Sequence, residues 1–143
     1  MEVHKTRSLG LDIGDKRIGV ALSDAEGILA SPSTIIDRKD DTADIEAVTD
    51  IVNRYEVKQI IVGLPRSMDG SLGKQAEKVE DFTRKLCNCI EVPVEFRDER
   101  LTTVSARRLM REARPGKTKK KVRDDAIAAA VILQGYLDEG KHQ

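Results

Sequence analysis

The chain has 143 residues, of which 39% are hydrophobic and 35% are charged, and its formal net charge is zero. This length predicts one domain spanning residues 1–143, with frayed ends at 1–7 and 140–143. No apolar run approaches the ~20 residues of a membrane span, and the polar start lacks the apolar core of a secretory signal. The totals therefore exclude a membrane-spanning protein.

The zero net charge hides a basic strip near the C-terminal end. Nine basic residues and one acid lie between Arg107 and Arg123, so this segment carries +8 and the rest of the chain −8. Such a strip on an otherwise acidic protein is typical of a polyanion-binding surface, although charge runs are also found as solvated loops. Lys119, Lys120 and Lys121 are its candidate substrate contacts, and we expect them to precede the last helix.

The first half of the chain predicts a hairpin, a third strand and a helix. Ser8–Asp12 and Arg17–Ser23 have the pattern of strands joined by a tight turn at Gly14. A further extended run follows at Ser33–Ile36. Apolar residues recur at helical spacing over Asp40–Tyr55, which predicts a helix.

The second half alternates strands and helices. Gln59–Pro65 is apolar on both faces, as expected of a central strand covered on both sides. The order of all elements predicts an α/β fold with a mixed five-stranded sheet flanked by helices. The remaining predicted elements are a helix through Ala76, Val79, Phe82 and Leu86, a strand from Val92 to about Glu99, a helix from Thr102 or Thr103 to about Ala113, and a buried helix over Asp125–Glu139.

Two cysteines, Cys87 and Cys89, lie too close together to staple a fold. No second pair accompanies them in the sequence, as a zinc site of four cysteines would need. We expect both to be reduced thiols on or beside a helix, in a cytoplasmic protein.

Three carboxylates stand at the ends of predicted elements. Asp12 lies inside the first strand, where burying an unpaired carboxylate costs several kcal/mol. Glu99 ends the last strand and Asp125 starts the last helix. If the first and last strands lie close together in the middle of the sheet, all three share one opening beyond the strand ends. Clustered carboxylates repel one another unless a cation lies between them, and oxygen ligands suit Mg²⁺ or Mn²⁺.

Other roles for these residues stay open at this point. A single aspartate at a strand end is often a turn or capping residue, and Asp125 is a good helix N-cap. Glu99 could instead pair with Arg97 or Arg100. Composition does not separate Asp124 from Asp125, whereas Asp98 should face the opposite side of its strand from Glu99.

Four segments resemble one family in order and in spacing. LGLDIGDKRIGVALSD, IVGLPRSMDGSLG, RDERLTT and DDAIAAAVILQGYLD resemble the YqgF/RuvX family, whose members are described as pre-16S rRNA nucleases and as Holliday junction resolvases. The resemblance implies a ribonuclease H-like fold with strand order 3-2-1-4-5. It also implies a nuclease that uses Mg²⁺ or Mn²⁺ to hydrolyse phosphodiester bonds, acting in the 5′-end processing of pre-16S rRNA.

The resemblance also assigns residues. It places the metal ligands and catalytic acids on Asp12, Glu99 and Asp125, and substrate contacts on Arg100 and Lys16. The chain departs from its relatives at Asp15, where they commonly carry threonine. It departs again in doubling the late aspartate, which keeps Asp124 open as the third ligand.

Three other functions compete with this one. The first is a Holliday junction resolvase acting on branched DNA, and the second is a non-catalytic RNA-binding module. The third is an ATPase related to actin and Hsp70, which needs two such domains. A resolvase needs a stable two-fold dimer, and the helices show no spare apolar face, so we predict a monomer or weak dimer. We expect its partner to be nucleic acid, with RNA favoured over branched DNA, and a pre-ribosomal particle is a further candidate partner. We expect no membrane partner.

Overall fold

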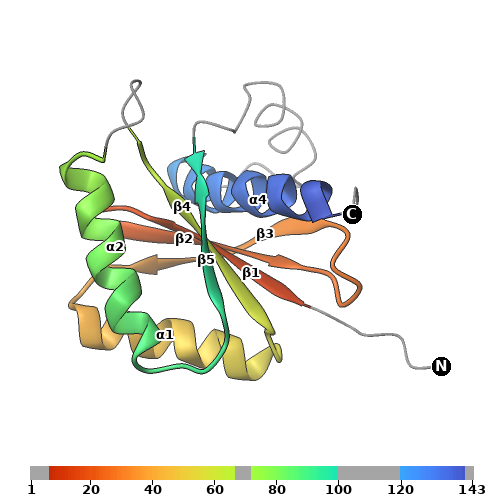
Figure 1. Ribbon diagram of the computed structural model, residues 1–143, viewed down its shortest axis with the longest axis horizontal. Helices are drawn as coiled ribbons and strands as arrows, with labels where there is room; N and C mark the ends of the chain where they lie inside the picture. Colours follow the sequence, from red (N-terminus) through yellow and green to blue (C-terminus); the bar gives the residue numbers. More distant parts are fainter. Residues whose placement is uncertain (1–6, 67–71, 100–119, 141–143) are drawn as a thin grey trace.

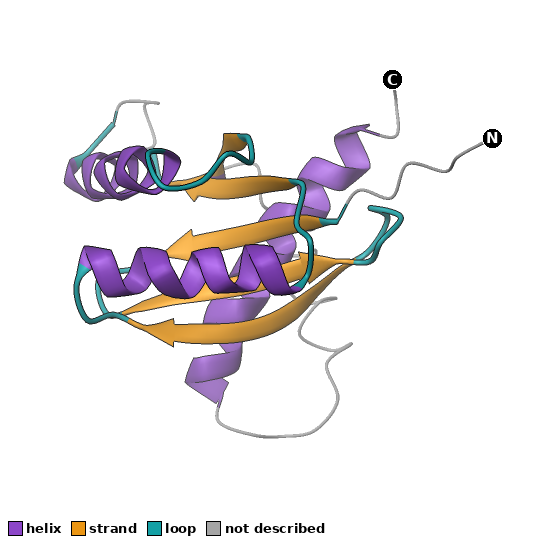
Figure 2. Cartoon of the chain, turned by 90° about the horizontal axis from the view of Figure 1, so that it is seen from below, coloured by secondary structure: helices purple, strands orange, loops and turns teal. Residues whose placement is uncertain are grey.

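The computed structural model describes residues 7–66, 72–99 and 120–140. These ranges form a five-stranded sheet with α1 and α2 on one face and α4 on the other (Figure 1; Figure 2). In chain order the elements are β1 (Ser8–Ile13), β2 (Arg17–Ser23), β3 (Ala30–Asp37), α1 (Asp41–Arg54), β4 (Gln59–Leu64), α2 (Lys74–Cys87), β5 (Val94–Asp98) and α4 (Lys120–Gly140).

The sheet has the strand order β3-β2-β1-β4-β5, which confirms the expected order and its mixed character. β1 pairs antiparallel with β2 and parallel with β4. β3 continues the antiparallel side, and β5 continues the parallel side as the other edge strand. β1 is therefore the central strand, with two strands on each side of it.

Alternation along the central strands separates two cores. Leu9 and Leu11 point toward α1 and α2, whereas Gly10 between them faces α4. A Cβ atom at Gly10 would lie 2.9 Å from both the Ala129 carbonyl oxygen and Leu133 Cβ. A glycine at this position therefore lets α4 lie close against the sheet, as glycines inside strands often do where another backbone approaches.

Arg38 fixes the turn that follows β1. Its Nη1 donates to the Gly14 carbonyl oxygen at 3.0 Å, and its Nε donates to the buried Asp44 carboxylate at 2.9 Å. Its Nη2 donates to Asp41 at 2.9 Å, and the guanidinium lies 5.0 Å from the centroid of the Phe82 ring. One side chain thus ties the end of β1 to both helices on that face.

Most element predictions are confirmed, and the main correction concerns α4. This helix begins at Lys120, five residues before the predicted start, so Asp125 lies inside it and is not an N-cap. Lys120 and Lys121 consequently belong to the first turn of the helix and do not precede it. Lysine has a high intrinsic helix propensity, so Lys120 and Lys121 can continue the helix N-terminal to its apolar stretch.

Two strands also differ from expectation. β5 begins at Val94, after Pro93, which has no N–H for the ladder, instead of at Val92. β3 extends from Ala30 to Asp37, well beyond the predicted run. Its Pro32 is tolerated because β3 is an edge strand, and its pairing with β2 contains an irregularity near Val20.

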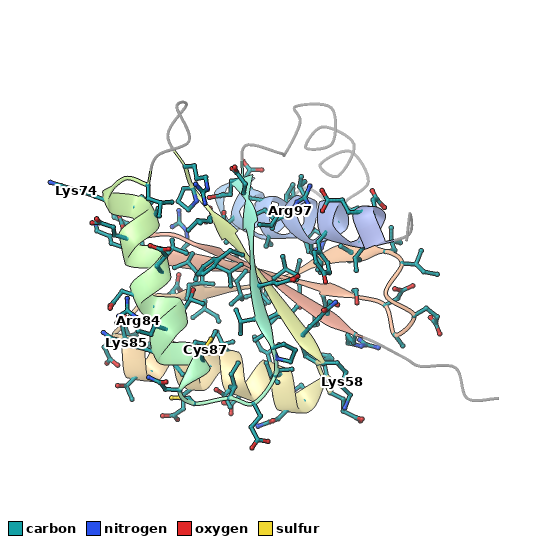
Figure 3. The ribbon with its side chains drawn as sticks, viewed as in Figure 1. Lys58, Lys74, Arg84, Lys85, Cys87 and Arg97 are labelled. Atoms are coloured by element: carbon teal, nitrogen blue, oxygen red, sulfur yellow. The ribbon has the colours of Figure 1, made fainter. Side chains whose placement is uncertain are left out.

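Some predictions lie outside the described residues. They are the helix from Thr102 or Thr103 to Ala113, Arg100, Lys119 and most of the basic strip. In the ranges that are described, no helix combines the length and apolar character that crossing a membrane requires. Cys87 ends α2 (Figure 3) and Cys89 follows it, which confirms their expected place on or beside a helix. Both thiols are free and exposed.

Candidate metal centre

Asp12 stands on the face of the sheet that α4 covers. It follows Gly10 by two residues along β1, so alternation directs both toward α4. The Asp12 side chain is half-buried, and its Cα partner on the neighbouring strand β2 is Gly19. On the other side, Leu11 pairs with Val62 of β4, which places Gly63 level with Asp12. A glycine therefore lies on each side of this carboxylate.

Gly19 brings Asp125 to Asp12. A Cβ atom at Gly19 would lie 2.0 Å from the Asp125 carbonyl oxygen and 2.4 Å from its carbonyl carbon. Any side chain here would overlap the helix backbone, so only glycine lets α4 approach this closely. Because Gly19 is the cross-strand partner of Asp12, Asp125 is held beside the central strand at the level of Asp12.

Gly63 makes room for Glu99. A Cβ atom at Gly63 would lie 3.1 Å from Glu99 Cγ and 3.3 Å from Glu99 Cδ. Glu99 directly follows β5, which is the edge strand, so the condition that the first and last strands lie together in the middle of the sheet is not met. The glutamate side chain instead lies over β4, at the level of Asp12, and this corrects the expected route of convergence.

The structure therefore places Asp12, Glu99 and Asp125 around two glycines on one face of the sheet. Three carboxylates without nitrogen or sulfur donors fit a hard divalent cation such as Mg²⁺ or Mn²⁺. In the conformation described, Arg17 Nε donates to Asp125 Oδ2 at 2.7 Å. Across the described ranges, no group of three or more acidic, histidine or cysteine side chains is already arranged to hold a metal ion.

The neighbouring acids lie in other contacts. Asp98 Oδ2 is 3.8 Å from Arg66 Nε, and Asp98 faces away from Glu99 as expected. Asp15, the additional acid of the β1–β2 turn, is exposed and lies 3.4 Å from Lys78 Nζ on α2. Neither residue therefore extends the group around Asp12.

Arg97, a candidate partner for Glu99 in the sequence, lies against α4 (Figure 3). Its Nη1 lies 2.6 Å from Glu139 Oε1, and the hydrogen bond to this guanidinium holds the pKa of the Glu139 carboxyl below its usual value. A Cβ atom at Gly135 would lie 2.7 Å from Arg97 Nη2. Arg97 therefore joins the end of β5 to α4, two residues before Glu99.

The candidate substrate contacts are only partly described. Lys16 is exposed in the turn that follows β1, and Lys120 and Lys121 form the start of α4, five and four residues before Asp125. Sequence reasoning missed Arg17, Gly19 and Gly63 as parts of this site. Glycines inside two strand patterns were the available signal, because such glycines often mark close backbone approach.

Comparison with solved structures shows the fold. Thermus thermophilus RuvC in complex with a Holliday junction superposes with a TM-score of 0.66 at 12% identity, covering 94% of this chain and 96% of RuvC. The yeast mitochondrial Holliday junction resolvase Ydc2 superposes with a TM-score of 0.64 at 12% identity, covering 96% of this chain and 81% of Ydc2. The chain therefore has the ribonuclease H-like fold of these proteins.

Relatives are similar over nearly their whole length. A protein of Halothermothrix orenii is 48% identical over 92% of this chain and 94% of its own, and one of Moorella thermoacetica is 50% identical over the same shares. Both carry the name "Putative pre-16S rRNA nuclease". The model of the RuvX family, described as Holliday junction resolvase, matches residues 6–139, and the chain belongs to this family.

Proposed function

We propose that this protein is a divalent-metal-dependent nuclease that hydrolyses phosphodiester bonds at the 5′ end of pre-16S rRNA. The observation that carries the proposal is the placement of Asp12, Glu99 and Asp125 around Gly19 and Gly63 on one face of the sheet. The names of the relatives support a ribosomal RNA precursor as the substrate. The ribonuclease H-like fold is shared with nucleases that cut nucleic acid.

In this proposal the three carboxylates hold Mg²⁺ or Mn²⁺. A metal held there would supply an activated water and would stabilise the leaving oxygen of the phosphodiester. Asp12 lies on the most constrained element, the central strand, so it fixes the position of the site. Glu99 reaches the site from the end of the edge strand, beside Gly63. Asp125 reaches it from α4, beside Gly19. The chain thus supplies ligands from three elements whose backbones are already packed together.

Phosphate binding is assigned to basic residues that are close in the sequence to Asp12, Glu99 and Asp125. Lys120 and Lys121 start α4, within about two helical turns of Asp125, so phosphates bound there lie close to the metal ligands. Lys16 and Arg100 complete the proposed contacts. The chain has two tyrosines, two phenylalanines and no tryptophan, so base stacking has few partners and binding should depend on phosphates.

Replacing Lys119, Lys120 and Lys121 together by alanine is expected to weaken RNA binding for any sequence. Each lost phosphate contact removes one released counterion, so the slope of log affinity against log salt should flatten by up to about three units. Binding measured by fluorescence anisotropy between low and moderate salt tests this. An unchanged slope with reduced cleavage would assign these lysines a role other than phosphate binding.

A junction resolvase is the second candidate, because the family model carries that description. Such an enzyme places two active sites symmetrically on a branched substrate and therefore needs a stable dimer. In the described ranges, the large exposed apolar side chains are spread over four segments of the chain and do not form one helix face. They are Ile28, Leu29, Tyr55, Leu72 and Phe96. This distribution favours the monomer or weak dimer that RNA trimming allows.

One experiment tests the proposed function against both alternatives. The purified protein is given a 5′-extended 16S rRNA precursor or a four-way DNA junction, each with Mn²⁺, beside the variant Glu99→Gln. We expect trimming of the RNA by the wild type, and loss of trimming with retained RNA binding in Glu99→Gln. Glu95→Gln is the matched control, because Glu95 is exposed on β5, four residues before Glu99, and should keep activity.

Two results would contradict the proposal. Paired symmetric cuts in the junction with the RNA untouched would favour the resolvase. Binding of RNA without any cleavage, by wild type and Glu99→Gln alike, would favour a non-catalytic module.

A further inference from the structure

The contact between Arg17 and Asp125 concerns metal binding directly. We propose that Arg17 is a positioning residue that holds the Asp125 carboxylate in the metal-free protein and gives it up when a divalent metal binds. The guanidinium and the metal then compete for the same carboxylate. This inference rests on the proposed function, because it assigns Asp125 to the metal.

The geometry leaves the Asp125 side chain as the part that can move. Its backbone lies directly against Gly19, so the Cα position is fixed by the packing of α4 on β2. Arg17 precedes Gly19 by two residues and lies on the same face of β2. The Arg17 and Asp125 side chains are 35% and 34% exposed, so the carboxylate can rotate without opening the core.

Charge explains why Arg17 is useful when no metal is bound. Three carboxylates on one face of a sheet repel one another, and the guanidinium compensates one of them. The 2.7 Å contact between Arg17 Nε and Asp125 Oδ2 is short, as expected for a charge-assisted hydrogen bond. With this contact in place, the acidic side chains of the described ranges do not form a group of three that could hold a metal.

Release of Arg17 is inexpensive because a second carboxylate lies opposite it. Arg17 pairs across the ladder with Asp37 of β3, which is exposed, and opposite charges at directly paired positions attract each other.

The alternative is that Arg17 stays in place and orients Asp125 while the other carboxylate oxygen binds the metal, as hydrogen-bond partners of metal ligands often do. The two cases differ in what happens to the Arg17 N–H.

Nuclear magnetic resonance of the arginine side chains separates these cases. A hydrogen-bonded Nε–H exchanges slowly with water, and the Arg17 signal is identified by its loss in Arg17→Lys. During a titration with Mg²⁺, we expect this signal to move and to exchange faster at the concentrations that shift the backbone amides of Asp12 and Gly19. The Nε–H of Arg38, bonded to buried Asp44 at 2.9 Å, is the internal control and should stay unchanged.

Metal affinity gives an independent readout. A partly exposed ion pair contributes about 1 kcal/mol, so Arg17→Gln should bind Mn²⁺ up to about fivefold more tightly in calorimetry. Lys16→Gln removes the same charge from the adjacent exposed position and should change affinity less. The increase in Mn²⁺ affinity caused by Arg17→Gln should be smaller in an Asp125→Asn background, because the carboxylate for which Arg17 and the metal compete is then missing.

Four results would overturn the inference. Shifted amides with a still-protected Arg17 Nε–H would make Arg17 an orienting partner that never leaves. Weaker Mn²⁺ binding in Arg17→Gln, or an equal gain in both backgrounds, would exclude competition for Asp125. Amides of Asp12 and Gly19 that do not respond to Mg²⁺ at all would overturn the metal site itself, and this inference with it.

Discussion

Asp12→Asn is expected to abolish stoichiometric Mn²⁺ binding and to lower RNA cleavage by at least about a hundredfold, since even hydrogen-bond partners of metal ligands cost about 10- to 100-fold. Asparagine keeps the size of the side chain but removes the charge that a divalent cation needs. The loss should be large because Asp12 lies on the central strand between Gly19 and Gly63. Among the described residues, no other side chain from this strand can take its place as a ligand. Calorimetry with Mn²⁺ and a cleavage assay measure the two effects.

The matched control for this substitution is Asp15→Asn. Asp15 is three residues away, exposed and close to Lys78, so the same change of charge should leave Mn²⁺ binding in place. The metal-free Asp12→Asn protein should be at least as stable as the wild type in urea, because repulsion among the carboxylates is relieved. Equal Mn²⁺ binding by wild type and Asp12→Asn would contradict the assignment of Asp12.

Gly19→Ala is the second change with a large expected effect, although Gly19 carries no functional group. The added Cβ atom would overlap the Asp125 carbonyl group, at 2.0 Å from its oxygen, and a backbone cannot rotate aside as a side chain can. We expect a loss of about 3 kcal/mol or more in the free energy of unfolding, at the upper end for overpacked cores. Because α4 must move, Mn²⁺ binding should weaken as well.

Gly10→Ala separates the two consequences of Gly19→Ala. Gly10 also lies under α4, but an added Cβ atom would be 2.9 Å from Ala129 and Leu133, so the helix needs to yield less. We expect moderate destabilisation in urea with Mn²⁺ binding mostly retained. If both variants lost the metal to the same degree, the close approach at Gly19 would have no particular role in placing Asp125.

The fold could be predicted from the sequence because its apolar residues follow helical spacing in the helices and form short extended runs in the strands. The hairpin, the internal strand β4 (Gln59–Leu64) and α1 agree with the prediction to within a few residues. The start of α4 was placed too late, because Lys120 and Lys121 were interpreted as part of a charged loop although lysine favours helix. The lysines were assigned to a loop because of their charge, although their helix propensity is compatible with the observed start of α4.

The site was predictable only in part. Asp12, Glu99 and Asp125 stood out because carboxylates at element ends are few and costly to bury together. Arg17 did not stand out, since its contact with Asp125 joins positions 108 residues apart and no local pattern predicts it. The position of Glu99 was also missed, because its reach over β4 depends on Gly63 lacking a side chain. Such features depend on packing between distant segments.

The most direct test of the proposed centre is a crystal structure of the protein grown with Mn²⁺, using anomalous scattering to locate the metal. We predict an anomalous peak on the α4 face of the sheet, about 2.1 Å from carboxylate oxygens of Asp12, Glu99 and Asp125. The Arg17 guanidinium should have moved away from Asp125 in that structure. A site without a peak, with the three side chains well ordered and Arg17 still bonded to Asp125, would contradict the account.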